Sequence, residues 1–497
     1  MLQRIILNLL IVNILCACGS EANAPPKPSN LSGKELATLY CGSCHLQPTP
    51  DLLDKKTWTK SILPEMAFFM GMRPIHDKMF QMSPDDISAM LKTSMYASKP
   101  MLAQADWQKM VDYYTTEAPD SLPKQVQKAP ISSKLPFFEV KTLSNTEIPY
   151  ISILKIDTLN HSFYIGHRNK LFVENYNTAF KKIDSMRIES PVSDVFLQNK
   201  DKFLLQMGIM DPNEARKGKF SKYSAQNVST NLVDSLQRPV HLSVADLNQD
   251  GIEDYLICNY GNLLGKLAWY DGKTHQENIL KPLPGARNTM IRDMNQDGLM
   301  DIVVLMCQAR EEISIFYNQG NGVFNEEIVL QFPPVYGSSY MELADMNGDG
   351  MTDIVYTNGD NADFSMILKP YHGVRIFINE GQNRFQEQYF YPIYGASKVM
   401  TADFDKDGDL DMAIIAFFPN VNQLPYQGFL FFENKGNNVF DISTFEHANK
   451  GKWLVMDVGD LDGDGKMDIL LGSYAKSKWV GDAKEMPMVV WLKNKSK

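Results

Sequence analysis

The chain has 497 residues and a formal net charge of −10, from 49 Lys and Arg against 59 Asp and Glu. This acidic balance argues against nucleic acid as a partner, because negative side chains repel the phosphate backbone. The length also exceeds what one hydrophobic core usually organises, so we expect at least two domains.

The first residues have the pattern of a secretory signal peptide. Arg4 precedes an almost wholly apolar run over residues 5–15, which is too short to span a bilayer comfortably but fits an h-region. Residues 15–19 read Leu-Cys-Ala-Cys-Gly and resemble the lipobox of bacterial lipoproteins. The resemblance implies a signal peptide over residues 1–17 and a lipid on Cys18. Ordinary secretion, with Cys18 a spare thiol, is the alternative.

These features predict a protein outside the cytoplasm. Residues 18–32 are rich in Ala, Pro, Ser and Asn, which is typical of a flexible tether. No later stretch of the sequence is long and apolar enough for a transmembrane helix. We therefore expect lipid anchoring to a bacterial membrane, with the periplasmic or surface face of the outer membrane as its place.

Residues 41–45 read Cys-Gly-Ser-Cys-His, which is the c-type haem attachment motif. The spacing sets Cys41 and Cys44 about one helical turn apart, as addition to the two vinyl groups requires, and His45 then reaches the iron as proximal ligand. A chance match or a redox C-x-x-C is the alternative. The export signal favours one covalent haem c, because this group is attached outside the cytoplasm.

Residues 33–117 have the size and pattern of a small all-α cytochrome c domain. Within it, residues 104–116 carry apolar residues at helical spacing, as in the C-terminal helix that crosses the N-terminal one in small cytochromes. Residues 118–134 contain three prolines and scattered lysines and predict a linker.

The sixth iron ligand is less sharply indicated. Met66 follows a Leu-Pro turn and is our first choice, with Met70 second, since methionine raises the reduction potential relative to a second histidine. Several methionines must instead pack in the core, which is their usual role. The other candidates are Met72, His76, Met95 and Met101.

Beyond the linker, five nine-residue segments repeat in register, with starts 47 to 58 residues apart. Oxygen ligands at positions 1, 3 and 5 suit Ca²⁺, Gly at position 6 permits the turn, and the carboxylate at position 9 would complete the shell. The candidate ligands, loop by loop, are Asp246, Asn248, Asp250 and Asp254; Asp293, Asn295, Asp297 and Asp301; Asp345, Asn347, Asp349 and Asp353; Asp403, Asp405, Asp407 and Asp411; and Asp460, Asp462, Asp464 and Asp468.

The closing Asp at position 9 and the strand-like segments after each loop distinguish these segments from EF-hands. They resemble the FG-GAP/VCBS repeats of integrin-type β-propellers. That resemblance implies about five Ca²⁺ ions, one on each loop, which would offset the formal charge of −10.

The repeats predict an all-β seven-bladed propeller over residues 135–497. Five calcium blades occupy residues 237–497, and two degenerate blades occupy residues 147–236. The last blade lacks room for its outer strand, so we expect residues 137–143 to complete it and remove the open edge. Cys258 and Cys307 lie in apolar runs typical of strands; two buried thiols are expected, and a disulfide is the alternative.

The sequence names no catalytic residues, because no nucleophile–base set and no phosphate loop is recognisable. Several polar residues precede the loops and could face a central channel, although ordinary strand-end hydrogen bonding is the preferred interpretation. They are Arg238, His241, Arg287, Asn288, Arg292, Tyr340 and Lys398.

The favoured hypothesis is a membrane-anchored haem electron-transfer protein whose propeller docks a redox partner protein or a carbohydrate. One alternative is a periplasmic dehydrogenase acting on a sugar, alcohol or aldehyde and reducing the fused haem. The other alternative is a glycan-binding or adhesion module. Whether the chain is an enzyme stays open at this point, because a fold alone does not specify activity.

Overall fold

The computed structural model describes most of the chain after residue 25. The predicted signal peptide and Cys18 lie outside the described residues. Among the described residues, no helix combines the length and the apolarity needed to cross a membrane. The described ranges are 26–80, 82–93, 95–144, 147–308, 310–362, 365–475 and 486–497.

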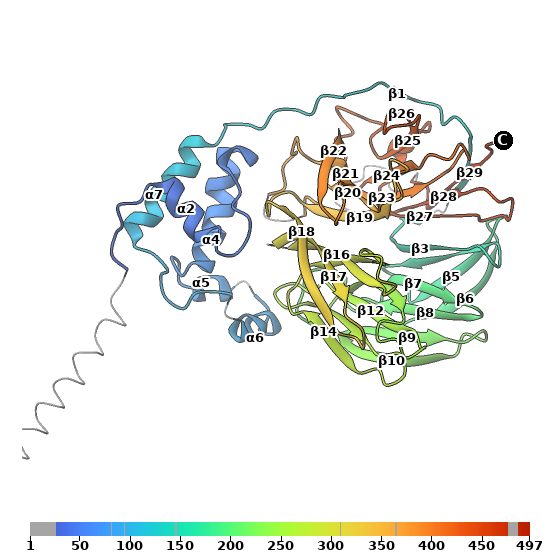
Figure 1. Ribbon diagram of the computed structural model, residues 1–497, viewed down its shortest axis with the longest axis horizontal. Coiled ribbons are helices and arrows are strands. Elements are labelled where there is room, and N and C mark those ends of the chain that lie inside the picture. Colours follow the sequence, from blue (N-terminus) through green and yellow to red (C-terminus); the bar gives the residue numbers. More distant parts are fainter. Residues whose placement is uncertain are drawn as a thin grey trace, which may run out of the picture. The chain divides into compact units, whose positions relative to one another are not determined.

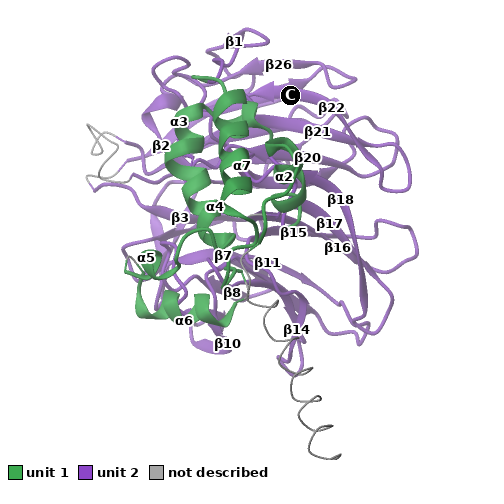
Figure 2. Ribbon diagram, turned by 90° about the vertical axis from the view of Figure 1, so that its left-hand side faces the viewer, with its two compact units in different colours: residues 1–43, 49–121 green, residues 44–48, 122–497 purple. Residues whose placement is uncertain are grey.

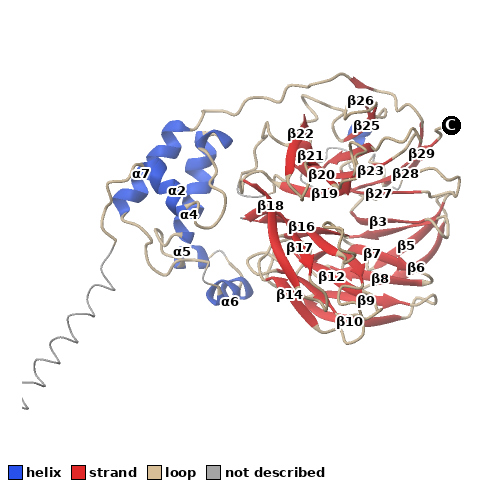
Figure 3. Cartoon of the chain, viewed as in Figure 1, coloured by secondary structure: helices blue, strands red, loops and turns tan. Residues whose placement is uncertain are grey.

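The chain divides into two compact units, which are coloured separately in Figure 2. One unit comprises residues 1–43 and 49–121, and the other comprises residues 44–48 and 122–497. Helices dominate the first unit and strands the second (Figure 3). Each unit is described by itself below.

The helical unit is built around the first and last of its helices, α2 and α7, which contact each other. Ser32 begins α2 with a capping box, in which its hydroxyl accepts from the Glu35 N–H and Glu35 accepts from the Ser32 N–H. Trp58 and Tyr114 form the buried centre, with ring centroids 4.4 Å apart. The α-helices are α2 (Gly33–Tyr40), α3 (Lys55–Thr57), α4 (Leu63–Phe69), α5 (His76–Met79), α6 (Pro84–Lys92) and α7 (Gln104–Glu117).

The second unit consists of seven sheets, each with at least four strands, and we number these blades in chain order. Figure 1 shows the sheets arranged around a common axis. Blade 1 contains β3 (Ile151–Asp157), β4 (Ser162–His167), β5 (Phe172–Asn177) and β6 (Lys182–Arg187). Blade 2 contains β7 (Val192–Gln198), β8 (Asp201–Gln206), β9 (Gly218–Tyr223) and β10 (Ser229–Leu236).

The other five blades carry the repeated acidic segments. Blade 3 contains β11 (Pro239–Ala245), β12 (Asp254–Asn259), β13 (Lys266–Tyr270) and β14 (Glu277–Lys281); blade 4 contains β15 (Ala286–Arg292), β16 (Asp301–Gln308), β17 (Arg310–Asn318) and β18 (Phe324–Phe332). Blade 5 contains β19 (Ser338–Ala344), β20 (Asp353–Asn358), β21 (Gly373–Asn379) and β22 (Phe385–Pro392). Blade 6 contains β23 (Ala396–Ala402), β24 (Asp411–Ala416), β25 (Phe429–Asn434) and β26 (Phe440–Ser443), and blade 7 contains β27 (Trp453–Gly459), β28 (Asp468–Ser473) and β29 (Val489–Asn494).

The blades close into a ring. The first strand of each blade contacts the first strand of the next, and β27 contacts β3, so these strands surround the axis. Within the described residues, a separate hydrophobic cluster fills each of the seven gaps between neighbouring blades. Burial between blades therefore supplies the main stabilisation of the ring.

The outer strand of blade 7 comes from the start of the unit. β2 (Phe138–Leu143) pairs antiparallel with β29, from Phe138 opposite Asn494 to Leu143 opposite Val489. This is the place expected for residues 137–143 from the sequence. Phe138 packs its ring against Phe404 and Phe431, at centroid distances of 5.8 and 5.2 Å. Pairing with β2 covers the outer edge of β29 and gives blade 7 its fourth strand.

The second half of the predicted linker is not a free tether. Gln125 is buried; its backbone N–H donates to the Tyr394 hydroxyl (2.8 Å), and its Nε2 donates to the His372 carbonyl (2.7 Å). Further on, β1 (Ile131–Ser132) pairs in parallel with β26. Residues 125–132 therefore form a strap along blades 5 and 6, which the proline-rich composition did not predict.

The role of β2 in closing blade 7 can be tested by truncating the side chain of Phe138. We expect Phe138→Ala to lower the free energy of unfolding of the propeller by about 2 kcal/mol, because it removes ring contacts that seal blade 7 against blade 6. Val140→Ala is the matched control on the same strand, since Val140 is 44% exposed and should change stability by less than about 0.5 kcal/mol. Urea unfolding followed by tryptophan fluorescence measures both. Equal effects of the two substitutions on stability would contradict this role of β2.

Candidate functional site

The C-x-x-C-H segment continues from the end of α2. Cys41 caps that helix in helical conformation, and its N–H donates to the Ala37 carbonyl (2.9 Å). The chain then turns through residues 41–44. His45 places Nδ1 3.0 Å from the Leu46 carbonyl oxygen. If Nδ1 carries the proton in that hydrogen bond, Nε2 has a free lone pair, which is the tautomer that ligates a metal through Nε2.

The helical unit, which contains Cys41, has a hollow and several exposed apolar side chains. A hollow of about 480 Å³ lies beside the motif and is lined by Lys34, Glu35, Thr38, Leu39, Gly42 and Ser43. Large apolar side chains of the same unit are exposed, including Leu39 (56%), Phe80 (88%) and Leu91 (67%). Cys41, Cys44 and His45 are the residues that could hold a covalent haem.

The candidate distal ligands fall in different environments. Met66 lies in α4 and is half-buried, whereas Met70 ends that helix and is buried. Met95 and Met101 are exposed, and so is His76 at the start of α5. Met72 is held by its N–H, which donates to the Ala67 carbonyl. Burial of Met70 matches a packing role and leaves Met66 the better candidate.

The five acidic loops occupy equivalent places in blades 3 to 7. Each connects the first strand of its blade to the second, and its ninth residue begins that second strand. In the loop of blade 4, Asp293 accepts from the N–H groups of Asp297 and Gly298, and Asn295 Oδ1 accepts from the Asp297 N–H. These bonds curl the backbone so that the side chains at positions 1, 3 and 5 converge, as a hard cation requires.

The ninth-position carboxylates are buried and bound to backbone. In every loop, Oδ2 accepts from the N–H of the second loop residue, and Oδ1 accepts from an N–H just after the third strand or at its end, at 2.8 to 3.1 Å. This Asp was expected to complete the ligand shell. Its first role in the structure is to join the loop to the rest of its blade.

Two loops carry a fourth carboxylate and have the strongest cation-binding character. The carboxylates of Asp403, Asp405 and Asp407 converge within 4.8 Å, as do those of the loop at Asp460. Burial raises the pKa of the ninth-position Asp411 to about 7 and that of Asp468 to about 6. Anionic oxygens crowded at low dielectric favour a bound cation.

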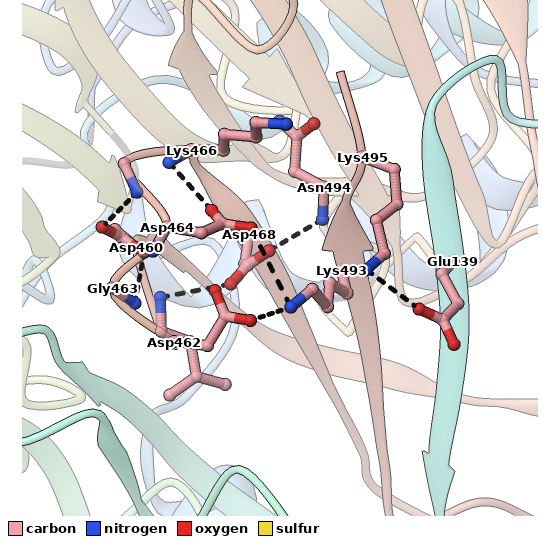
Figure 4. A network of polar contacts seen from close by, with 12 residues as sticks. Glu139, Asp460, Asp462, Gly463, Asp464, Lys466, Asp468, Lys493, Asn494 and Lys495 are labelled. Carbon is pink, nitrogen blue, oxygen red and sulfur yellow. Dashed lines mark hydrogen bonds and ion pairs between the residues drawn. The ribbon is translucent and has the colours of Figure 1, made fainter. Parts of the chain in front are cut away.

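Polar atoms in these two loops lack protein partners. The buried Oδ1 atoms of Asp403 and Asp462 accept no hydrogen bond. In the loop of blade 7, the Lys493 ammonium contacts Asp462 and lies 3.9 Å from Asp464 Oδ2 (Figure 4). A side-chain cation thus already lies against this cluster, and the donor set fits a hard metal ion.

Asparagines at the ends of third strands have a role that the sequence analysis did not predict. Asn318 and Asn494 each end the third strand of a blade, and their amides reach the preceding blade's loop. Asn318 Nδ2 donates to the Leu247 carbonyl (3.1 Å), and Asn494 Nδ2 donates to the Phe404 carbonyl (2.8 Å). Asn318 starts an Asn-Gln-Gly turn that can be read in the sequence, but the sequence does not indicate its partner in the preceding blade.

The polar residues near the axis mostly bind neighbouring strands. Asn288 donates to the Met341 carbonyl and Lys398 to the Met456 carbonyl, both at 2.9 Å. Arg238 donates to the Gly261 carbonyl. The preferred interpretation, hydrogen bonding at strand ends, accounts for these three candidates.

Four charged residues at the axis were not predicted: Lys155, Asp194, Glu342 and Asp457. Lys155 Nζ lies 3.8 Å from Asp457 Oδ1, and Asp194 lies 3.9 Å from His241 Nε2. Burial lowers the pKa of His241 to about 4, so this histidine is neutral near pH 7. Both pairs join different blades, and the ion pair of Lys155 and Asp457 links the inner strands of blades 1 and 7 electrostatically.

Residues 293–356 match the family model of an FG-GAP-like repeat. The match runs from the loop of blade 4 into β20 of blade 5 and includes two acidic loops. This stretch of the propeller is therefore an FG-GAP-like repeat.

Two curated relatives share a minority of the chain. Cartilage acidic protein 1 of Mus musculus is 28% identical over 197 residues, covering 36% of this chain and 27% of its own length. The same protein of Homo sapiens is 27% identical, with coverages of 36% and 26%. The aligned region spans about a quarter of the length of these relatives.

Among solved structures, virginiamycin B lyase from Staphylococcus aureus aligns with 72% of this chain and 99% of its own at 9% identity and a TM-score of 0.47. A likeness at this level carries no argument about activity. The evidence for seven blades is the strand pairing described above.

The axial charges predict a pH-dependent stability. Burial raises the pKa of Glu342 to about 7, well above its unfolded value. The folded state therefore keeps the proton that the unfolded chain loses between about pH 4.5 and 7, and stability falls as pH rises through this window. We expect Glu342 to contribute about 1 to 3 kcal/mol to this loss and Glu342→Gln to remove that contribution, while the contributions of Asp411 and Asp468 remain.

Urea unfolding at fixed calcium between pH 5 and pH 8 measures this slope. Glu380→Gln is the control, because Glu380 is exposed and its removal should leave the profile unchanged. Parallel profiles for wild type and Glu342→Gln would contradict the assignment.

Proposed function

We propose that the chain is an extracytoplasmic c-type haem electron-transfer protein with a calcium-binding propeller that docks a partner or ligand. The observation that carries the proposal is the C-x-x-C-H turn at the end of α2, where the His45 Nδ1 contact with a carbonyl oxygen is compatible with metal ligation through Nε2. When bound, haem c would supply one-electron transfer. Cys41 and Cys44 would hold it covalently, and His45 would be the proximal ligand.

The surface of the helical unit supports this part of the proposal. Leu39 is exposed and lines the hollow that includes Gly42 and Ser43 of the motif, so an apolar side chain is available beside the proposed haem. Met66 is the proposed distal ligand. Its half-buried position after Pro64 leaves its thioether accessible to a group at the unit's surface.

Calcium is the proposed ligand of the five propeller loops. Support comes from the convergence of oxygens at positions 1, 3 and 5 and from the unpartnered oxygens of Asp403 and Asp462. In the loop of blade 7, a bound ion would have to displace the Lys493 ammonium, so this site should be weaker than the loop at Asp403.

Anchoring by a lipid on Cys18 is also proposed, on the strength of the Leu-Cys-Ala-Cys-Gly segment. It would hold the protein at a bacterial membrane, outside the cytoplasm. A carrier needs contact with redox partners at such a surface, and this requirement is consistent with the haem assignment.

The haem assignment predicts a c-type absorption spectrum for protein matured with a haem-attachment system. Met66→Ala should abolish the weak long-wavelength band of methionine–iron ligation while the covalent haem is retained. Met95→Ala is the control, because Met95 is exposed on the same unit. Protein without covalent haem would refute the proposal, and an unchanged band in Met66→Ala would refute the distal ligand.

Reduction of the haem, followed in the same absorption spectrum, distinguishes the carrier hypothesis from the dehydrogenase hypothesis. Haem reduction by an added sugar, alcohol or aldehyde alone would favour the dehydrogenase. Reduction only when a second redox protein is added would favour the carrier, which is the expected result.

Substitutions in one loop separate the structural role from the metal role. Asp301→Asn should lower stability by about 1 to 3 kcal/mol even with a chelator, because it sets an amide donor against a backbone N–H. Asp297→Asn should change the chelated protein much less, because Asp297 is exposed and an amide oxygen can still accept from the Leu299 N–H. It should reduce the stabilisation gained on adding calcium. Thermal melting with and without calcium checks both. Calcium stabilisation that survives Asp297→Asn in full would contradict a metal site in this loop.

A further inference from the structure

A groove lined by side-chain amides opens between blades 4 and 5. Its volume is about 490 Å³. It is formed by the acidic loop and outer hairpin of blade 4 and by the β21–β22 turn of blade 5. Six of its lining residues carry carboxamides: Asn295, Gln296, Gln319, Asn325, Gln382 and Asn383.

The floor of the groove is fixed by hydrogen bonds. Asn383 is only 8% exposed, and its Nδ2 donates to the Met294 carbonyl and to the Tyr317 hydroxyl, both at 2.9 Å. Its Oδ1 accepts from Asn379 Nδ2 at 3.1 Å. The two blades are thereby joined beneath the groove, and the Tyr317 ring is held in place without using the amides of the walls.

The wall residues Asn295, Gln296, Gln319, Asn325 and Gln382 are exposed. Asn295 is bonded within its own loop, and Gln319 Nε2 donates to the Tyr317 carbonyl. The carboxamides of Gln296, Asn325 and Gln382 line the groove, and each has a donor beside an acceptor, which matches two adjacent hydroxyl groups. The half-buried Tyr317 ring adds an apolar surface suited to the C–H face of a sugar. The lining contains no lysine or arginine, and the neighbouring carboxylates of Asp293 and Asp297 disfavour an anion.

We propose that this groove binds a neutral oligosaccharide. The site combines several convergent polar groups with an aromatic surface on a rigid floor, as small-molecule sites usually do. The inference rests on the docking role proposed for the propeller and does not involve the haem.

The loops of blades 3 and 7 do not form a similar site. The loop of blade 3 has the same Asn-Gln pair at Asn248 and Gln249, but Trp269 lies beside it. The Trp269 ring is so close to Gly322 that a Cβ on that glycine would come within 2.7 Å of the ring. In blade 7 the Lys493 ammonium lies against the loop. Of these three loops, the loop of blade 4 is therefore the one that opens onto an amide-lined groove.

Titration calorimetry of the full chain in calcium buffer tests the proposal. The probes are maltohexaose, cellohexaose and mannohexaose as neutral ligands and hexagalacturonate as an anionic one. The test variant is Gln296→Ala with Gln382→Ala, and Asn325→Ala is a second variant on β18. Gln249→Ala is the matched control, because Gln249 is exposed at the same loop position and shares the left-handed backbone of Gln296 (φ 66 against 62).

We expect at least one neutral hexasaccharide to bind, and its affinity to fall about tenfold or more in both test variants but not in Gln249→Ala. Failure of all three neutral probes at millimolar concentration would overturn the proposal. Undiminished affinity in the test variants, or preference for hexagalacturonate, would do the same. Thermal melting verifies that the variants are folded. A failed haem assignment would show in the absorption spectrum and leave these titrations unchanged.

Discussion

The propeller depends on a buried carboxylate that is bonded twice to backbone. In blades 3 to 7, the ninth loop residue uses one oxygen for the loop and the other for the end of the third strand. An unsatisfied N–H in this position would cost about 1 to 3 kcal/mol. One side chain thus fixes the loop, the second strand and the hairpin of a blade together. Positions 1, 3 and 5 then converge because the loop ends are already held.

Blades 1 and 2 show what the ring does without this device. Tight turns connect their first and second strands, with left-handed residues at His161 and Asn199. In the turn of blade 1, Asp157 accepts from the backbone and side chain of Asn160, at 3.1 and 2.8 Å. A carboxylate still organises the connection, but it acts locally and offers no cluster of acids. A bound cation would therefore act on the acidic blades, where the carboxylates cluster.

The sequence predicted those features that repeat or that follow from local chemistry. The loops with their flanking strands, the seven blades and the closing strand at Phe138 could all be predicted from periodicity and from the missing outer strand. Contacts that depend on a neighbouring blade could not. Glu342 and Asp457 lie in unremarkable strand segments, and only the closed ring brings them near Lys398. Gln125 belongs to a proline-rich stretch, and its partners are more than 240 positions away.

The protonation of the acidic loops changes with pH near neutrality. The five loops hold 17 carboxylates at positions 1, 3, 5 and 9, against a formal net charge of −10. Burial is the main cause of the raised pKa at the ninth position, and values of about 7 and 6 occur at Asp411 and Asp468, in the loops with a fourth acid. A proton can therefore partly neutralise these loops near neutral pH. A bound divalent cation would take over that neutralisation and release the proton, so its affinity should rise with pH. Because these carboxylates also hold each loop to the third strand of its own blade, occupancy of a loop and rigidity of its blade are coupled through the same atoms.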